Sequence, residues 1–431
     1  MTARRVGRFP RLSGWDPPSP YGFDAPGSQA GLGQRALPTT AGSNFRRRRT
    51  RYPVPGTLHP TRHPIPGKIH LVSVPSVPQI LDALRVVQDP DLRRDIVALD
   101  FVKNVQIGAD GAVAFAIELT TPACPVKDQL KEQARTAVAA LPGVTSVAIE
   151  MTSSVRSSGA IGGQRQALPG VKNIIAVGAG KGGVGKTTMA VNLALALAQK
   201  GSRVGLLDAD IYGPNVPIML GVQAVLETDA RQKIVPVMKH GLATVSMGFL
   251  AGDGDPVIWR GPMLHGVLRQ FLQDVAWPAL DYLVVDMPPG TGDVALSLSQ
   301  HTAVTGAVVV TTPQTVSVAD SRRAIQMYRK LNIPVLGLVE NMSYFACPSC
   351  RHETDLFGRG GGEQLAVQLD VPFLGAVPIA EPVRAGGDVG VPIVLGAPEH
   401  AVAQAITSVA ERMAAQVSIQ AFRTIPLTPV S

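Results

Sequence analysis

A glycine-rich segment near the middle of the chain combines residue types and spacing suited to holding phosphate. It reads Gly180-Lys-Gly-Gly-Val-Gly-Lys-Thr-Thr188 and satisfies the pattern G-x-x-x-x-G-K-[ST]. An apolar run at 174–177 precedes it and a helical pattern at 189–199 follows it. Glycines let backbone N–H groups turn toward phosphate oxygens, and the N-terminus of a following helix adds positive potential. The strand–loop–helix context therefore predicts a nucleotide phosphate site rather than a plain Gly-rich turn.

Individual side chains of this segment have separate chemical roles. Lys186 is expected to reach the β- and γ-phosphates of the nucleotide, and the hydroxyl of Thr187 is expected to bind Mg²⁺. The predicted nucleotide-binding residues of the loop are Gly180, Lys181, Gly182, Gly183, Val184, Gly185, Lys186, Thr187 and Thr188.

Three aspartates stand at the ends of two further apolar runs. Asp208 and Asp210 follow Leu206-Leu207, and Asp286 ends Leu283-Val-Val-Asp, before a Gly-rich stretch that contains Gly290. Ligand sites of parallel α/β sheets lie at the carboxyl ends of the strands. We predict that Asp286 holds Mg²⁺ through water and that Gly290 responds to the γ-phosphate. Spacing alone does not divide the roles of Asp208 and Asp210, and capping of a helix N-terminus is the other interpretation for both.

A cysteine pair later in the chain is a candidate metal site. Cys347-Pro-Ser-Cys350 has C-x₂-C spacing, and one such pair supplies two of the usual four ligands. His352 is a candidate third ligand. A two-fold symmetric dimer would bring four cysteines together, which suits a bridging [4Fe–4S] cluster or a structural zinc equally. A redox dithiol is a further interpretation, because the pair alone is weak grounds for any of these.

The pattern of apolar residues predicts the strands and helices that position these side chains. Five short apolar runs, at 174–177, 204–207, 282–285, 307–310 and 335–339, alternate with helical patterns. Strands that are apolar on both faces indicate a parallel sheet covered by helices. We predict a doubly wound, mostly parallel α/β domain at 171–417, preceded by a small α/β domain at 74–152 and a linker at 153–170. Residues 1–66 are predicted to be a disordered Arg/Pro/Gly-rich tail, and 418–431 a C-terminal tail.

Charge and cysteine content narrow the class of protein. The chain has a net charge of +8, but residues 1–65 hold 11 of the 40 basic and 2 of the 32 acidic residues. The remaining 29 basic and 30 acidic residues leave the rest close to neutral, so we expect no folded nucleic-acid-binding face. Three cysteines argue against a disulfide framework, and no apolar run is long enough for a membrane span.

The loop also resembles a known family. Its early lysine, Lys181, matches the deviant Walker A pattern K-G-G-x-G-K-[ST]-[ST] of partition ATPases, nitrogenase iron protein and iron–sulfur carriers. The resemblance implies a dimer in which Lys181 reaches the partner's nucleotide. It also implies that Asp210 orients the attacking water, so that the catalytic residues are Lys181, Lys186 and Asp210, with Asp208 nearer Mg²⁺. Asn341, at the end of the 335–339 run, resembles the purine-contacting asparagine, and 378–384 resembles the later purine-side loop. ATP rather than GTP is implied by the family alone.

Further motifs make the resemblance more specific. Four motifs resemble those of Mrp/ApbC/NBP-type iron–sulfur cluster carrier ATPases, and the resemblance runs over about 172–400. They are Glu340-Asn-Met-Ser-Tyr-Phe-Ala-Cys-Pro-Ser-Cys, Phe357-Gly-Arg-Gly-Gly-Gly362, Val257-Ile-Trp-Arg-Gly-Pro-Met263 and Thr312-Pro-Gln-Thr-Val-Ser-Val-Ala-Asp320. The resemblance implies a slow ATPase that binds a labile [4Fe–4S] cluster through Cys347 and Cys350 between two protomers. It also implies partners of two kinds, iron–sulfur scaffold proteins and apoprotein clients.

The small domain resembles an iron–sulfur assembly domain often fused to Mrp proteins. Asp89-Pro-Asp91 and Thr120-Thr-Pro-Ala-Cys-Pro125 carry that likeness, which suggests Cys124 as a reactive or cluster-handling thiol. Packing under a helix start is the equal alternative, although a helix N-terminus would lower the pKa of this thiol.

Other functions and locations stay open at this point. A MinD/ParA-like positioning ATPase acting on membrane or DNA is the main alternative, although the helical pattern at 400–416 lacks the basic face that a membrane-binding helix needs. A nitrogenase-type reductase fits less well, because its cysteines are widely separated. We expect a cytoplasmic protein, or one of an organellar matrix or stroma if the Arg-rich tail is a transit peptide.

Overall fold

The computed structural model describes residues 74–157, 167–210, 213–249, 261–290 and 292–424. The predicted tail at 1–66 lies outside the described residues, as do half of the predicted linker (158–166), the end of the C-terminal tail and residues 257–260 of one family motif.

The small domain packs two helices against a three-stranded sheet. Its elements in chain order are α1 (Val77–Leu84), β1 (Gln88–Asp89), β2 (Arg94–Asp95), β3 (Val102–Ile107), β4 (Ala112–Leu119), α2 (Lys127–Ala139) and β5 (Ser146–Ser153). β3 and β4 pair antiparallel, whereas β5 runs parallel to β4 because α2 crosses between them. A turn at 108–111 joins β3 to β4, with Gly111 at a φ of 82°. Ile80, Phe101, Ile117 and Leu130 are buried in the core that these elements share.

The larger domain is built around one sheet. Its elements are β6 (Ile174–Ala179), α3 (Lys186–Gln199), β7 (Val204–Asp208), α4 (Val216–Leu220), β8 (Glu227–Thr228), β9 (Ile234–Val235), β10 (Val237–Lys239), β11 (Leu242–Ser246), η1 (Met247–Phe249), α5 (Gly261–Gln273), β12 (Tyr282–Asp286), α6 (Gly292–His301), β13 (Gly306–Thr311), α7 (Thr315–Lys330), β14 (Val335–Ala346), β15 (Glu353–Thr354), α8 (Gly361–Gln368), β16 (Phe373–Ile379), α9 (Glu381–Val389), α10 (Ile393–Gly396) and α11 (Ala401–Thr424).

The strand order confirms the predicted doubly wound fold. Across the described residues the order is β10-β11-β7-β12-β6-β13-β14, with β16 beside β14 and β15 paired with the end of β14. All neighbouring pairs are parallel except β10 with β11 and β15 with β14. A mostly parallel sheet needs helical cover on both faces.

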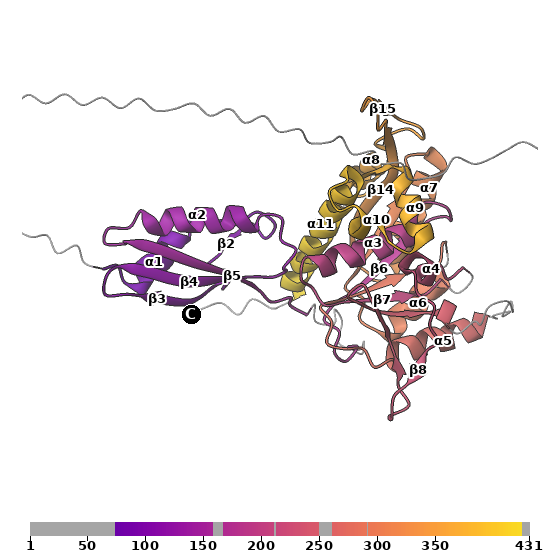
Figure 1. The fold of residues 1–431 in the computed structure, drawn as a ribbon, viewed down its shortest axis with the longest axis horizontal. Coiled ribbons are helices and arrows are strands. Elements are labelled where there is room, and N and C mark those ends of the chain that lie inside the picture. Colours follow the sequence, from indigo (N-terminus) through magenta and orange to yellow (C-terminus); the bar gives the residue numbers. More distant parts are fainter. Residues whose placement is uncertain (1–73, 158–166, 211–212, 250–260, 291, 425–431) are drawn as a thin grey trace, which may run out of the picture. The chain divides into compact units, whose positions relative to one another are not determined.

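The two faces of the sheet are covered by different helices. Along β6, Ile175 and Val177 enter the core that α3 and α11 cover, whereas Ile174 and Ala176 enter the core that α5, α6 and α7 cover. Figure 1 shows α3 and α11 on one side of the strands and α5 and α6 on the other. The central strands are apolar along their whole length because both faces are buried.

The register brings the ends of three strands to one edge. Asp286, the last residue of β12, is paired with Asp208 at the end of β7 and with Val177 near the end of β6. The strand ends that carry Asp208 and Asp286 therefore lie beside the end of β6, from which the phosphate loop starts.

Several predicted boundaries differ from the structure. β14 does not end before Asn341 but continues to Ala346, so that Asn341 lies inside the strand, not at its end. β11 is a parallel strand that the sequence analysis did not include, and α11 extends to Thr424, into the predicted C-terminal tail. In the part of the chain that the structure describes, no helix combines the length and apolar character that a membrane span requires.

Candidate functional site

The loop between β6 and α3 has the backbone of a phosphate-binding loop. Gly183 and Gly185 have φ angles of 81° and 80°, a region that side chains with a Cβ rarely adopt. A Cβ on Gly180 would lie 2.2 Å from a backbone carbon of Asp320 in α7. α3 begins at Lys186, so the loop runs directly into a helix N-terminus, as the sequence predicts.

Lys186 lies where the predicted catalytic and metal-binding residues meet. Its ammonium nitrogen is 2.6 Å from Oδ1 of Asp286 and 3.5 Å from Oδ2 of Asp210. The same nitrogen is 3.3 Å from the hydroxyl oxygen of Thr187. Gly290 also contacts this region, since its N–H donates to the carbonyl of Ala179 at 3.3 Å. The structure therefore brings together residues that are a hundred positions apart in the chain.

Asp286 has the features of a cation ligand. Its carboxylate is fully buried, and burial raises its pKa even though Lys186 acts in the opposite direction. Among the described residues no donor reaches its second oxygen, Oδ2. A buried carboxylate oxygen without a donor, beside the Thr187 hydroxyl, matches the oxygen ligands that Mg²⁺ prefers. These residues therefore fit the predicted metal.

Asp208 has a different environment. Its oxygens accept hydrogen bonds from the Ser246 hydroxyl at 2.8 Å, from the Asp210 N–H at 3.2 Å and from the Val216 N–H at 3.3 Å. Burial and the neighbouring Asp286 raise the pKa of Asp208 to about 7. The side chain fixes the path of the segment after β7, and its assignment to Mg²⁺ stays a prediction. Ser246 was missed by the sequence analysis, although it is a polar residue at the end of an apolar run.

A cavity of about 430 Å³ opens beside the phosphate loop. Thr187, Thr188, Asn341 and Met342 contribute to its lining, together with residues of α4, the segment 377–388 and Ile406 of α11. The volume and the position next to the phosphate-binding residues suit the base and ribose of a nucleotide.

Asn341 contacts the phosphate loop as well as the cavity. Its side-chain nitrogen donates to the carbonyl of Val184 at 2.9 Å. A Cβ on Gly185 would lie 2.3 Å from that nitrogen, so the glycine leaves the space that Asn341 occupies. Its predicted contact with the purine is compatible with this position and stays a prediction.

Lys181 lies on the same loop and is half-buried. Its predicted contact is with a second protomer, and that role stays a prediction.

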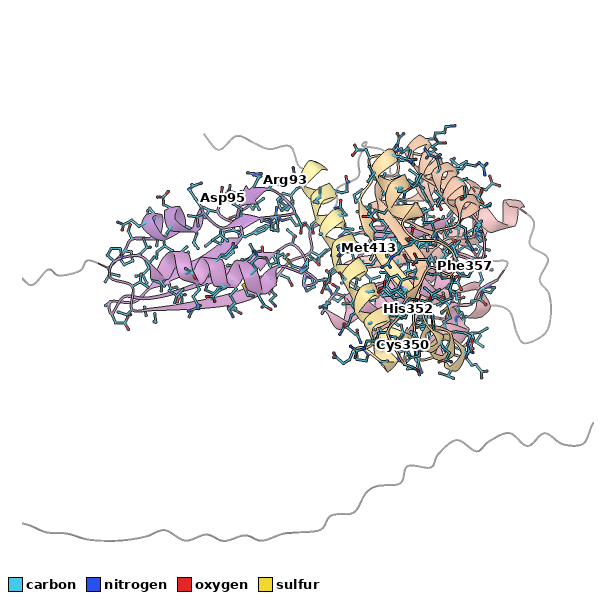
Figure 2. The ribbon with its side chains drawn as sticks, turned by 90° about the horizontal axis from the view of Figure 1, so that it is seen from above. Arg93, Asp95, Cys350, His352, Phe357 and Met413 are labelled. Atoms are coloured by element: carbon cyan, nitrogen blue, oxygen red, sulfur yellow. The ribbon has the colours of Figure 1, made fainter. Side chains whose placement is uncertain are left out.

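The cysteine pair occupies the tip of a hairpin formed by β14 and β15. Phe345 and Ala346 pair antiparallel with Thr354 and Glu353, and the Cys347 N–H donates to the His352 carbonyl at 3.0 Å. Cys347 is half-buried and Cys350 is exposed. In Figure 1 the label β15 marks this hairpin at the edge of the domain, and Figure 2 labels Cys350 and His352 within it.

The turn around Cys347 favours a thiolate. Backbone N–H groups of Cys350 and Ser349, together with the Cys350 side chain, lower the pKa of Cys347. This is the predicted arrangement in which backbone N–H groups point at a sulfur. Within the described residues, no three His, Cys, Asp or Glu side chains form a group that could hold a metal, so His352 does not complete a site with the two cysteines.

Cys124 belongs to the small domain and is not part of this hairpin. The thiol is half-buried and packs against the small-domain core. Burial raises its pKa to about 11, and a backbone hydrogen bond from Val126 only partly offsets that effect. The expected lowering by the helix N-terminus is therefore wrong, because loss of hydration outweighs it.

Comparisons with known proteins agree with these features. The profile of NUBPL iron-transfer P-loop NTPases matches residues 170–414, and the profile of an iron–sulfur cluster assembly protein family matches 78–150. An iron–sulfur cluster carrier protein of Synechocystis is 51% identical over 347 residues, which cover 79% of this chain and 98% of the relative. The Escherichia coli K12 protein of the same name is 43% identical over 333 residues, or 77% of this chain and 89% of the relative. Among solved structures, an Archaeoglobus fulgidus nucleotide-binding protein in complex with ADP is 38% identical, with a TM-score of 0.47, and the match covers 52% of this chain and 88% of that one.

Proposed function

The chain belongs to the family of NUBPL iron-transfer P-loop NTPases, and on this basis we propose that it is an ATP-hydrolysing carrier of iron–sulfur clusters. The cluster is the cargo of this activity. Cys347 and Cys350 of two protomers would hold it, and apoproteins would receive it.

The nucleotide half of the proposal is supported by the loop and its neighbours. Lys186 would neutralise charge on the β- and γ-phosphates, while the N–H groups of the loop bind phosphate oxygens. Thr187 and Asp286 would hold Mg²⁺, which would supply positive charge against the developing charge of phosphoryl transfer. Asp210, whose carboxylate lies 3.5 Å from the Lys186 nitrogen, is close enough to orient a water at the same centre.

Cluster binding, the second part of the proposal, is supported by the number of ligands that a cluster needs. One hairpin offers two cysteine sulfurs, and a cluster requires four ligands. Two copies related by a two-fold axis would supply Cys₄. A half-buried Cys347 and an exposed Cys350 suit a cluster held at a surface between protomers, from which it can be released.

The observation that carries the proposal is the continuity of β14. One strand, Val335–Ala346, contains Asn341 beside the phosphate loop and ends one residue before Cys347. A single strand therefore connects the phosphate loop to the cysteine hairpin, so a movement of the loop on nucleotide binding would reach the cysteines through β14.

The test is anaerobic reconstitution of the wild-type protein and of a Cys347→Ala/Cys350→Ala variant. We expect the wild type to take up iron and sulfide and to restore an apo [4Fe–4S] enzyme. The variant should do neither but should still bind ATP. Absorption spectra and iron, sulfide and zinc analysis measure the first result, and activity of the apoenzyme measures the second.

Cys124→Ala is the matched control, because it removes the third cysteine without touching the hairpin. It should load as the wild type does. A full cluster in the Cys347→Ala/Cys350→Ala protein, or zinc in place of iron in the wild type, would contradict the proposal.

A further inference from the structure

Glu340 is a buried carboxylate in β14 that none of the roles above requires. The residue is 1% exposed. One oxygen accepts hydrogen bonds from the Gly360 N–H at 2.9 Å and the Ser343 hydroxyl at 2.6 Å, and the other accepts from the Gly362 N–H at 2.6 Å. Burying a carboxylate is costly unless donors of this kind compensate for lost hydration. Glu340 therefore fixes the start of α8, which follows the cysteine hairpin in the chain.

The neighbouring side chain holds the phosphate loop. Asn341 donates to the carbonyl of Val184 at 2.9 Å. Successive side chains of a strand point to opposite faces, so Glu340 and Asn341 leave β14 in different directions. The same two residues of the strand are thus attached to the nucleotide loop on one side and to the glycine segment 360–362 on the other.

The strand changes its path directly after this pair. Met342 has a φ of 55°, and the register of β14 with β16 shifts between Asn341 and Phe345. A left-handed backbone is uncommon for a residue other than glycine and tends to occur at functional sites. Met342 also lines the cavity beside the phosphate loop. The irregular point of the strand therefore lies at the cavity and precedes the cysteines along the chain.

The segment that Glu340 fixes also holds the hairpin. Arg359 precedes Gly360, and its guanidinium lies 4.2 Å from the centre of the Tyr344 ring. It also donates to the Glu353 carboxylate at 2.6 Å. Tyr344 lies on β14 and Glu353 on β15, so Arg359 contacts both strands of the hairpin. Figure 2 labels Cys350, His352 and Phe357 along this stretch between β14 and α8.

We propose that Glu340 is a positioning residue that makes the arrangement of Cys347 and Cys350 depend on the nucleotide at the phosphate loop. The route runs from Val184 through Asn341 and Glu340 to the glycine segment, and from there through Arg359 to the hairpin. This inference deepens the proposed function and rests on its assignment of the nucleotide site and the cysteine pair.

The test uses cluster-free, reduced protein and measures alkylation of the peptide that contains Cys347 and Cys350 by mass spectrometry. In the wild type, ATP with Mg²⁺ should change the labelling rate by about fivefold or more, the range of ordinary coupling between sites. In Glu340→Gln the change should fall below about twofold while ATP affinity stays within about twofold of wild type. Glutamine has nearly the shape of glutamate, but its side-chain NH₂ group would face a backbone N–H of Gly360 or Gly362. One of the two hydrogen bonds to the glycine segment would therefore be lost.

Two further variants separate position from charge. Glu363→Gln removes a carboxylate from the exposed side of the same helix start and should keep the wild-type response. Ser343→Ala removes one donor to Glu340 but leaves both bonds to the glycine segment, so it should also keep the response. Loss of the response in either variant, or its retention in Glu340→Gln, would overturn the proposal.

Hydrogen exchange on the wild type provides a measurement that does not depend on the folding of any variant. ATP should alter exchange in peptides covering 357–364, because the Gly360 and Gly362 amides are bound to Glu340. Unchanged exchange there would refute the inference. Neither measurement needs a cluster, so failure to load iron would count against the proposed function and leave this result standing.

Discussion

Lys186 is held by carboxylates that also belong to the predicted metal and water sites. Its 2.6 Å contact with Asp286 and 3.5 Å contact with Asp210 place its charge where phosphate oxygens would bind. We expect Lys186→Ala to lower ATP turnover by about a hundredfold or more, as loss of a preorganised charge-stabilising group does. A steady-state phosphate-release assay measures this. Lys200→Ala, which removes a lysine just beyond the end of the same helix, should leave turnover within about twofold, and undiminished turnover in Lys186→Ala would contradict the assignment.

The two kinds of cysteine should differ in reactivity. Burial raises the pKa of Cys124 to about 11, whereas backbone N–H groups lower the pKa of Cys347. Because the thiolate is the nucleophile, Cys124 should be alkylated at least about tenfold more slowly than the hairpin cysteines near pH 8. Site-resolved mass spectrometry gives both rates from one sample. Urea should remove the difference. If Cys124 reacts first in the folded protein, a reactive rather than a packed thiol is the better description.

At the scale of elements, Asp281 connects the starts of three strands that carry the site. It precedes β12 and accepts hydrogen bonds from Lys172, before β6, at 3.0 Å and from Arg203, before β7, at 2.9 Å. Burial alone would raise the pKa of Asp281, but hydrogen bonds from Arg203 and Lys172 outweigh burial and lower it to about 2. This ion-paired carboxylate therefore stabilises the order β7-β12-β6 at the edge opposite the nucleotide.

Asp281→Asn should reduce the free energy of unfolding by about 1–2 kcal/mol at neutral pH, a value discounted because its partners are partly exposed. A folded pKa below the unfolded value means that the stabilisation is present above about pH 4 and is lost as the pH falls toward 2. The difference between wild type and variant should therefore shrink in that window. Urea unfolding at a series of pH values measures it. Asp274→Asn, which breaks an exposed pair with Lys233, should change stability by less than about 0.5 kcal/mol at any pH, and an equal effect of both variants would show that the position of Asp281 is unimportant.

The elements themselves divide into those that sequence pattern can predict and those that it cannot. Five central strands are apolar on both faces, and the loop at 180–188 needs its glycines for local backbone reasons, so both are readable from the chain alone. β14 was predicted too short because Asn341, Ser343 and Tyr344 break the apolar pattern. Those polar residues have partners that the apolar pattern does not show. Asn341 donates to the distant Val184, Ser343 donates to Glu340 three residues earlier, and the Arg359 cation lies above the Tyr344 ring. Ser246 and Glu340 were missed for the same reason, since their partners are set by packing and not by spacing.

At the scale of the whole molecule, the proposal requires two copies of the chain. Lys186 is predicted to contact the nucleotide of its own protomer, and Lys181 is predicted to contact the nucleotide of the partner. A protomer with Lys186→Ala has lost its own site but can still donate Lys181, and a protomer with Lys181→Ala has kept its own loop lysine but cannot donate. Mixing the two variants therefore creates heterodimers in which one complete site forms in the Lys181→Ala protomer.

We expect each variant alone to hydrolyse ATP at a few per cent of the wild-type rate or less, and an equal mixture to recover about a quarter of it. The value follows because random pairing makes about half of the dimers heterodimers, each with one complete site of two. A phosphate-release assay over a range of mixing ratios measures the recovery, which should be greatest at equal amounts. Mixing Lys186→Ala with a Lys186→Ala/Lys181→Ala double variant is the matched control and should recover nothing. If the mixture shows only the average of the two separate rates, Lys181 does not act across an interface, and the shared arrangement proposed for both nucleotide and cluster loses its physical basis.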